Sequence, residues 1–174
     1  MSEQKRKLLV FAGKPGVGKS TIIKRLFPEL HVVDVEPFVM EFQVNGFINE
    51  DKTLLGYQNM YAHITQIDQP IVVLEIGTNH PDFNVQSLHA LTKTHDVRLF
   101  LCEASRETCT ARANERGLLH SKEGFERRMA RDFPNTFLNC LRDVPVPHVV
   151  INFEGPLEET AQKVKELALS GKTE

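Results

Sequence analysis

Eight residues near the start of the chain have the types and spacing that bind phosphate: Gly13, Lys14, Pro15, Gly16, Val17, Gly18, Lys19 and Ser20. They fit the pattern G-x-x-x-x-G-K-[ST] without a departure. Glycines in such a loop let backbone N–H groups turn inward around phosphate oxygens, and the N-terminus of the following helix favours negative charge. A lysine at position 19 can reach the β- and γ-phosphates, and the hydroxyl of Ser20 can bind Mg²⁺. These residues, together with Thr21, predict a site for a nucleoside triphosphate and Mg²⁺.

The flanking residues agree with this interpretation. Residues 8–12 form an apolar run of strand length, and residues 21–27 have helical spacing that ends at Pro28. Strand, glycine loop and helix follow one another in the order that a phosphate-binding loop requires. The alternative is a glycine-rich turn before an ordinary helix, and the combined flank and spacing favour the phosphate site.

Composition limits the class of protein. The 174 residues predict a single domain over 1–174, and a net charge of −2 argues against a surface built for duplex nucleic acid, although it leaves room for a local basic patch. No apolar stretch reaches the length of a membrane span, and the N-terminus lacks the apolar core of a signal peptide. The three cysteines, Cys102, Cys109 and Cys140, have no C-x-x-C spacing. We expect reduced thiols in a cytoplasmic protein.

Five apolar runs alternate with segments long enough to be helices, which predicts an α/β sandwich of three layers with a parallel sheet. The predicted strands are residues 7–12, 31–35, 71–76, 97–102 and 148–153. Two connections, 35–70 and 103–147, are longer than a simple crossover needs. Since ligands bind beyond the carboxyl ends of parallel strands, these extra segments are expected to hold and cover a second substrate.

Two carboxylates, Asp34 and Glu36, follow the second predicted strand. At this place one of them could take a proton from an attacking hydroxyl, or both could hold Mg²⁺ through water. Asp34 is our first candidate for the base, and both are candidates for substrate binding. The structural alternative is that they only cap a helix that begins at Pro37.

The third predicted strand ends in polar residues. Glu75 could reach the Mg²⁺ shell, so Ser20 and Glu75 are the predicted metal ligands. Thr78 and Asn79 offer neutral groups that could orient a substrate. An ordinary strand-end turn is the alternative for all three.

Arginines in the long fourth connection could stabilise the negative charge of a transferring phosphoryl group. Arg112 and Arg116 lie four residues apart on one expected helix face, before Gly117. We expect one of them to contact phosphate, with residues 112–132 as a lid. Acidic residues interleave with the basic ones in this connection, and the pattern indicates solvated side chains for Arg127, Arg128 and Arg131.

Taken together, these motifs resemble those of small P-loop kinases of the nucleoside-monophosphate-kinase-like group, including zeta-toxin, polynucleotide-kinase, shikimate-kinase and gluconate-kinase types. The resemblance rests on the glycine loop, Asp34-x-Glu36, Thr78-Asn79 and Arg112-x-x-x-Arg116-Gly117, and spans nearly the whole chain. It implies a five-stranded parallel sheet of order 2-3-1-4-5, with a substrate-binding insert at 35–70, a lid, and ATP as the donor. It also implies that the turn at 152–156 contacts the adenine. Glu75 departs from the Asp of the polynucleotide-kinase signature.

The predicted function is ATP- and Mg²⁺-dependent transfer of the γ-phosphoryl group to a hydroxyl or phosphate of a small molecule or nucleotide. Lys19, Asp34, Arg112 and Arg116 are the predicted catalytic residues. Two alternatives stay open: a kinase of 5′-hydroxyl nucleic acid ends, which the net charge disfavours, and a non-catalytic nucleotide-binding regulatory protein. A GTPase is disfavoured because the sequence contains neither N-K-x-D nor D-x-x-G. The sequence does not determine the oligomeric state.

Overall fold

A computed structural model gives the structure of the chain and describes residues 5–45, 48–117 and 122–170. Five strands form one parallel sheet in the order β2-β3-β1-β4-β5, as predicted. The strands are β1 (Arg6–Gly13), β2 (His31–Asp34), β3 (Ile71–Ile76), β4 (His95–Glu103) and β5 (His148–Asn152). The helices are α1 (Lys19–Leu26), α2 (Val35–Met40), α3 (Glu50–Gln66), α4 (Pro81–Leu91), α5 (Arg106–Glu115), α6 (Lys122–Met129), α7 (Asn135–Asp143) and α8 (Leu157–Leu169).

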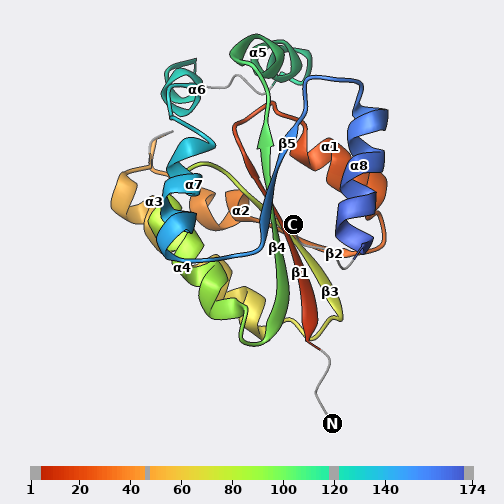
Figure 1. Cartoon of the computed structure of the whole chain (residues 1–174). Helices are drawn as coiled ribbons and strands as arrows, with labels where there is room; N and C mark the ends of the chain where they lie inside the picture. The colour runs from red at the N-terminus through yellow and green to blue at the C-terminus, as the bar shows by residue number, and fades with distance from the viewer. Residues whose placement is uncertain (1–4, 46–47, 118–121, 171–174) are drawn as a thin grey trace.

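Helices cover both faces of the sheet, so the central strands are apolar nearly throughout. One core cluster lies between the sheet and α3, α4 and α7, and the other lies between the sheet and α1 and α8 (Figure 1). The strands point with their carboxyl ends toward the end of the molecule where α5 and α6 lie. No helix in the described part of the chain is long and apolar enough to cross a membrane.

The predicted insert, residues 35–70, consists of α2 and α3 packed against each other. Asn49 caps α3 by accepting a hydrogen bond from the backbone N–H of Lys52, at 2.8 Å. Gly56 is needed at the helix crossing, because a Cβ there would lie 2.9 Å from the backbone of Phe38 and Val39. The close crossing brings α3, and with it Tyr57, over the end of β3.

The predicted lid, residues 112–132, contains the end of α5 and all of α6. Residues 118–121 of this segment lie outside the described residues. Helix α6 is attached to its surroundings by an ion pair between Arg106 and Glu126 and by Lys14, whose Nζ donates to the carbonyl of Met129 at 2.8 Å. The segment therefore lies directly beside the glycine loop.

Candidate active site

The glycine loop turns tightly from β1 into α1, and two of its glycines have backbone angles that other residues rarely adopt. Gly16 has φ 78° and Gly18 has φ 116°. A side chain at Gly16 would also collide with the backbone carbonyl of Cys109, because α5 packs directly on the loop. Gly18 caps α1 without a side-chain hydrogen bond, so the first N–H groups of α1 are free to face a phosphate.

Lys19 is nearly buried, with 8 % of its surface exposed. Its ammonium donates to the carbonyl of Gly13 at 2.8 Å and to that of Lys14 at 3.2 Å. The lysine thus curls back over the loop that it belongs to, and its charge is held where β- and γ-phosphates of a bound triphosphate would lie.

Ser20 and Glu75 are brought together as the predicted metal pair requires. The Ser20 hydroxyl donates to Glu75 Oε1 at 2.7 Å. Burial raises the pKa of Glu75. The charge of Lys19 and the hydrogen bond from Ser20 oppose this shift, whereas the carboxylates of Asp34 and Glu36 reinforce it. Two side-chain oxygens beside the predicted phosphate site could hold Mg²⁺, which binds proteins through one or two carboxylates plus substrate phosphates and water. In the described residues no cluster of three His, Cys, Asp or Glu side chains could hold a metal alone.

Asp34 lies next to this pair in the sheet, since its register partner on β3 is Glu75. Its Oδ1 accepts a hydrogen bond from the N–H of Glu36 at 2.9 Å, so it does cap α2. The second carboxylate oxygen has no hydrogen-bond partner in the described part of the chain. Asp34 can therefore cap the helix with one oxygen and receive a proton on the other, and the two sequence-based interpretations are compatible.

The turn after β3 carries Thr78 and Asn79 to the same edge of the sheet. Thr78 is only 5 % exposed. Asn84, which is fully buried, holds this turn: its Nδ2 donates to the carbonyls of Asn79 and His80, at 2.8 and 3.1 Å, and its Oδ1 accepts from Tyr61 at 2.7 Å. The turn needs this support because His80 adopts a left-handed backbone, with φ 50°.

Replacing Asn84 by alanine should lower the free energy of unfolding by about 2–3 kcal/mol, because Tyr61 and two carbonyls would lose their buried partner. Urea denaturation followed by circular dichroism measures this change. Asn59→Ala on the exposed face of α3 is the matched control and should stay within about 0.5 kcal/mol of the wild type. Equal effects of the two substitutions would contradict the role that we assign to Asn84.

The two predicted lid arginines contact the glycine-loop end of the fold by different routes. Arg112 donates from Nη1 to the carbonyl of Val17 at 2.6 Å and from Nη2 to that of Phe153 at 2.8 Å. Arg116 donates to the hydroxyl of Thr21, one residue beyond Ser20. Both guanidinium groups therefore border the glycine loop, and their contact with phosphate stays a prediction.

The interpretation of Arg131 as a solvated side chain is wrong. Arg127 and Arg128 are exposed, but Arg131 is half-buried and its Nη1 lies 3.4 Å from Thr78 Oγ1. The sequence pattern misled because Phe125 and Met129, the two buried residues of α6, are surrounded by charges. The turn after Met129 directs Arg131 back toward the end of β3.

Tyr57 and His80 are further residues at this edge that the sequence analysis did not select. Their rings meet edge to face with centroids 5.7 Å apart. Burial raises the pKa of Tyr57 to about 12, and burial lowers the pKa of His80, where Glu50 opposes and Arg131 reinforces the shift. Both side chains are thus neutral near pH 7. Neither has a motif around it, so only the packing of α3 on the β3 turn identifies them.

The loop at 152–156, predicted to contact a base, is anchored to the loop before α5. Glu154 accepts hydrogen bonds from the N–H of Ser105 and from the hydroxyl of Thr108, the latter at 2.6 Å, and these bonds lower its pKa. A shallow cavity of about 230 Å³ adjoins the loop and is lined by Asn152, Glu154, Gly155, Glu159, Thr160 and Lys163.

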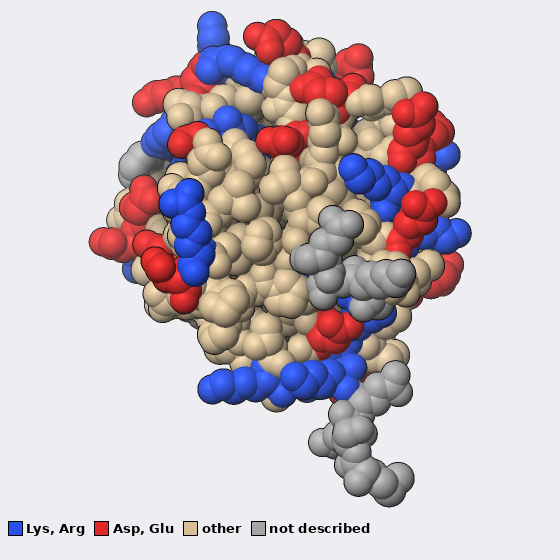
Figure 2. Space-filling view, viewed as in Figure 1, with Lys and Arg blue, Asp and Glu red and all other residues tan. Residues whose placement is uncertain are grey.

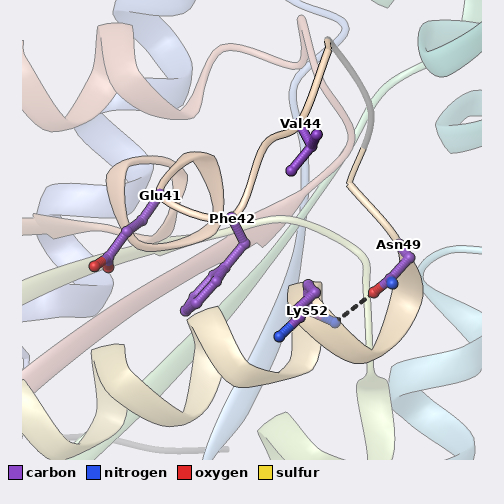
Figure 3. Close-up of a pocket in the computed structure, with 5 residues that line it drawn as sticks. All are labelled: Glu41, Phe42, Val44, Asn49 and Lys52. Carbon is purple, nitrogen blue, oxygen red and sulfur yellow. Dashed lines mark hydrogen bonds between the residues drawn. The ribbon is translucent and has the colours of Figure 1, made fainter.

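A larger cavity, of about 370 Å³, lies at the tip of the insert (Figure 3). It is lined by Glu41, Phe42, Val44, Asn49 and Lys52, and the ammonium of Lys52 lies 5.8 Å from the centre of the Phe42 ring. None of these residues is a candidate for phosphate, metal or proton transfer. The predicted phosphate, metal and base residues lie at the strand ends and do not line this cavity.

No family model matches the chain, and no curated protein matches it by sequence. Solved structures do resemble it. Shikimate kinase from Acinetobacter baumannii in complex with shikimate superposes with a TM-score of 0.62 at 19% identity, covering 97% of this chain and 96% of that one. A sugar kinase from Janibacter sp. HTCC2649 gives 0.56 at 12% identity, covering 95% of each chain. TT1252 from Thermus thermophilus gives 0.58 at 17% identity, covering 97% of this chain and all of that one. With its sheet order and glycine loop, the chain has the fold of the small P-loop kinases.

Proposed function

We propose that the protein is a phosphotransferase that moves the γ-phosphoryl group of ATP to a hydroxyl of a small acceptor, with Mg²⁺. The observation that carries this proposal is that the side chains predicted to bind phosphate, hold the metal and accept the proton lie together at one edge of the sheet. Lys19 supplies the phosphate contact, the Ser20–Glu75 pair offers the metal ligands, and Asp34 stands beside Glu75 with one free oxygen.

Each residue has a role that its contacts permit. Lys19 exchanges the carbonyls of Gly13 and Lys14 for phosphate oxygens, and the loop N–H groups hold the remaining phosphates. Asp34 accepts the proton of the attacking hydroxyl, which increases the nucleophilicity of the acceptor oxygen. Ser20 and Glu75 would hold Mg²⁺, which neutralises phosphate charge when it is bound. Arg112 and Arg116 border the loop, where a guanidinium stabilises negative charge as the phosphoryl group transfers.

The kinase names of the structural neighbours support this proposal at the level of the reaction, since their folds match nearly the whole chain. The net charge of −2 weighs against a nucleic acid end as the acceptor. On the face shown in Figure 2, Lys and Arg alternate with Asp and Glu around the edge, and no broad basic area is visible.

The experiment that tests the proposal measures production of ADP from ATP and Mg²⁺ across an acceptor panel. The panel holds sugars, hydroxy acids, nucleosides, nucleoside monophosphates and 5′-hydroxyl oligonucleotides. We expect one class to raise the turnover above the acceptor-free rate by at least tenfold, and EDTA to abolish the increase. ATP binding without stimulation by any class would instead favour a regulatory nucleotide-binding protein.

A further inference from the structure

Two exposed histidines lie side by side at the end of the sheet opposite to the glycine loop. His31 is the first residue of β2, and His63 is in the last turn of α3. Their ring centres are 6.5 Å apart. The fold brings them together because residues 67–70 join the end of α3 directly to the start of β3, where Val72 is the register partner of His31.

The ring nitrogens of this pair are available to a ligand. In the described part of the chain neither histidine has a hydrogen bond or an ion pair, and both have only ring contacts. By contrast, Nδ1 of His89, of His95 and of His148 each lies 2.7–2.8 Å from a protein oxygen. Imidazole is the commonest metal ligand in proteins, so two free imidazoles within reach of one ion form a candidate metal site.

The spacing of the two rings is close to the spacing that one metal ion requires. With metal–nitrogen bonds of about 2.0–2.1 Å, two imidazoles on a tetrahedral ion have ring centres about 5.2 Å apart, and two on opposite sides of an ion about 6.4 Å apart. The observed separation of 6.5 Å lies just beyond the longer value. Because both side chains are exposed, rotation about their side-chain bonds can bring the rings to either arrangement.

The surroundings of the pair determine how strongly an ion would be held. The ring of the half-buried Phe38 lies beside His63, with ring centres 5.7 Å apart, and it offers no atom that competes for the imidazole. In the described residues no third His, Cys, Asp or Glu completes a group of metal ligands. Water therefore fills the remaining coordination positions, so the ion should exchange readily and bind less tightly than in a closed structural site.

The chemistry of the ligands selects the kind of ion. Neutral imidazole suits Zn²⁺, Cu²⁺ and Ni²⁺, whereas Mg²⁺ prefers oxygen. The oxygens of Ser20 and Glu75 lie at the other end of the sheet, where Glu75 pairs with Asp34, the last residue of β2. A strand of this length puts Asp34 about 10 Å from His31. Zn²⁺ at the histidines and Mg²⁺ at the oxygens can therefore be studied in the same solution.

We propose that His31 and His63 form a surface site for one transition-metal ion of the Zn²⁺ type, which links β2 to α3. Strand β2 has only four residues, lies at the edge of the sheet and pairs with β3 alone. A metal ion that joins this short strand to the helix of the insert binds the folded chain and should stabilise it. The inference goes beyond the proposed function and does not depend on turnover, because the pair lies at the opposite ends of the strands from the glycine loop.

The test titrates the full chain, ¹⁵N-labelled at histidine, with ZnCl₂ in the presence of a large excess of Mg²⁺, and follows the imidazole resonances by NMR. We expect the resonances of His31 and His63 to shift together and saturably. His31→Ala and His63→Gln should each weaken this binding by about tenfold or more, because the second imidazole no longer holds the same ion. His89→Ala and Cys140→Ser, at other side chains that reach the surface, should bind Zn²⁺ as the wild type does.

Thermal unfolding gives a second readout. Zn²⁺ should raise the Tm of the wild type and of His89→Ala, and it should raise that of His63→Gln clearly less. The Tm values without metal show whether the variants fold. The inference is overturned if neither resonance shifts saturably, if only one of the two rings responds, or if His63→Gln binds Zn²⁺ as tightly as the wild type. Binding that is lost in Cys140→Ser and kept in His63→Gln would assign the ion to the thiol and would overturn it as well.

Discussion

Replacing Lys19 by alanine should reduce acceptor-stimulated ATP turnover by about 10²–10³-fold, the usual effect of removing one pre-positioned group that stabilises transition-state charge. Lys19 is nearly buried, and its ammonium is already held over the loop by two backbone carbonyls. The other lysine of the loop, Lys14, donates its Nζ to the carbonyl of Met129 at the end of α6 and not to the loop carbonyls. Steady-state kinetics with saturating acceptor measure the effect.

Lys24→Ala is the control for this substitution, because Lys24 lies on the same helix α1 and is exposed. It should change turnover by less than about twofold, as surface substitutions usually do. Thermal unfolding of both variants separates lost chemistry from lost structure. A Lys19→Ala protein that is folded and retains a third of the wild-type rate would contradict the phosphate-binding role of the loop.

Replacing Asp34 by asparagine should lower kcat by about 10²–10⁴-fold, the contribution of a general base. This substitution should change proton transfer without changing the local fold. Asparagine caps helices as well as aspartate does, so the hydrogen bond from the N–H of Glu36 and the start of α2 should be kept. What the variant loses is the capacity to accept a proton from the acceptor hydroxyl.

Glu36→Gln distinguishes the two carboxylates. Glu36 is exposed and is the second residue of α2, so we expect a loss of less than about tenfold. ATP affinity, measured by titration calorimetry, should be unchanged in Asp34→Asn, since its role concerns the acceptor. A larger loss in Glu36→Gln than in Asp34→Asn would transfer the base role to Glu36.

Much of the fold could be predicted because local and tertiary preferences agree. Strands β1, β3 and β4 are apolar on both faces, as buried parallel strands must be, and each overlaps the apolar run that predicts it. Helices α6 and α7 were not predicted. Helix α6 has eight residues and α7 has nine, which is shorter than the window over which helical periodicity can be recognised.

The site residues also divide into those that the sequence predicts and those that it does not. The glycine loop and Glu75 were found because their chemistry depends on spacing along one loop or on a strand end, and the Ser20–Glu75 hydrogen bond confirms that the two meet. Arg131, Tyr57 and His80 were missed because they come from three separate elements. Their proximity follows from how α3 and the segment after α6 pack over the β3 turn, which no local pattern encodes.

The contacts of Arg112 and Glu154 have a consequence for how a nucleotide would associate. Arg112 joins the glycine loop to the backbone of Phe153. Glu154, the next residue of the turn at 152–156, joins that turn to the start of α5. The spacing between the phosphate loop and the predicted base-contacting turn is therefore set when the chain folds. Little conformational entropy remains to be lost at these two loops when a nucleotide binds, so its phosphates and base meet surfaces that are already aligned.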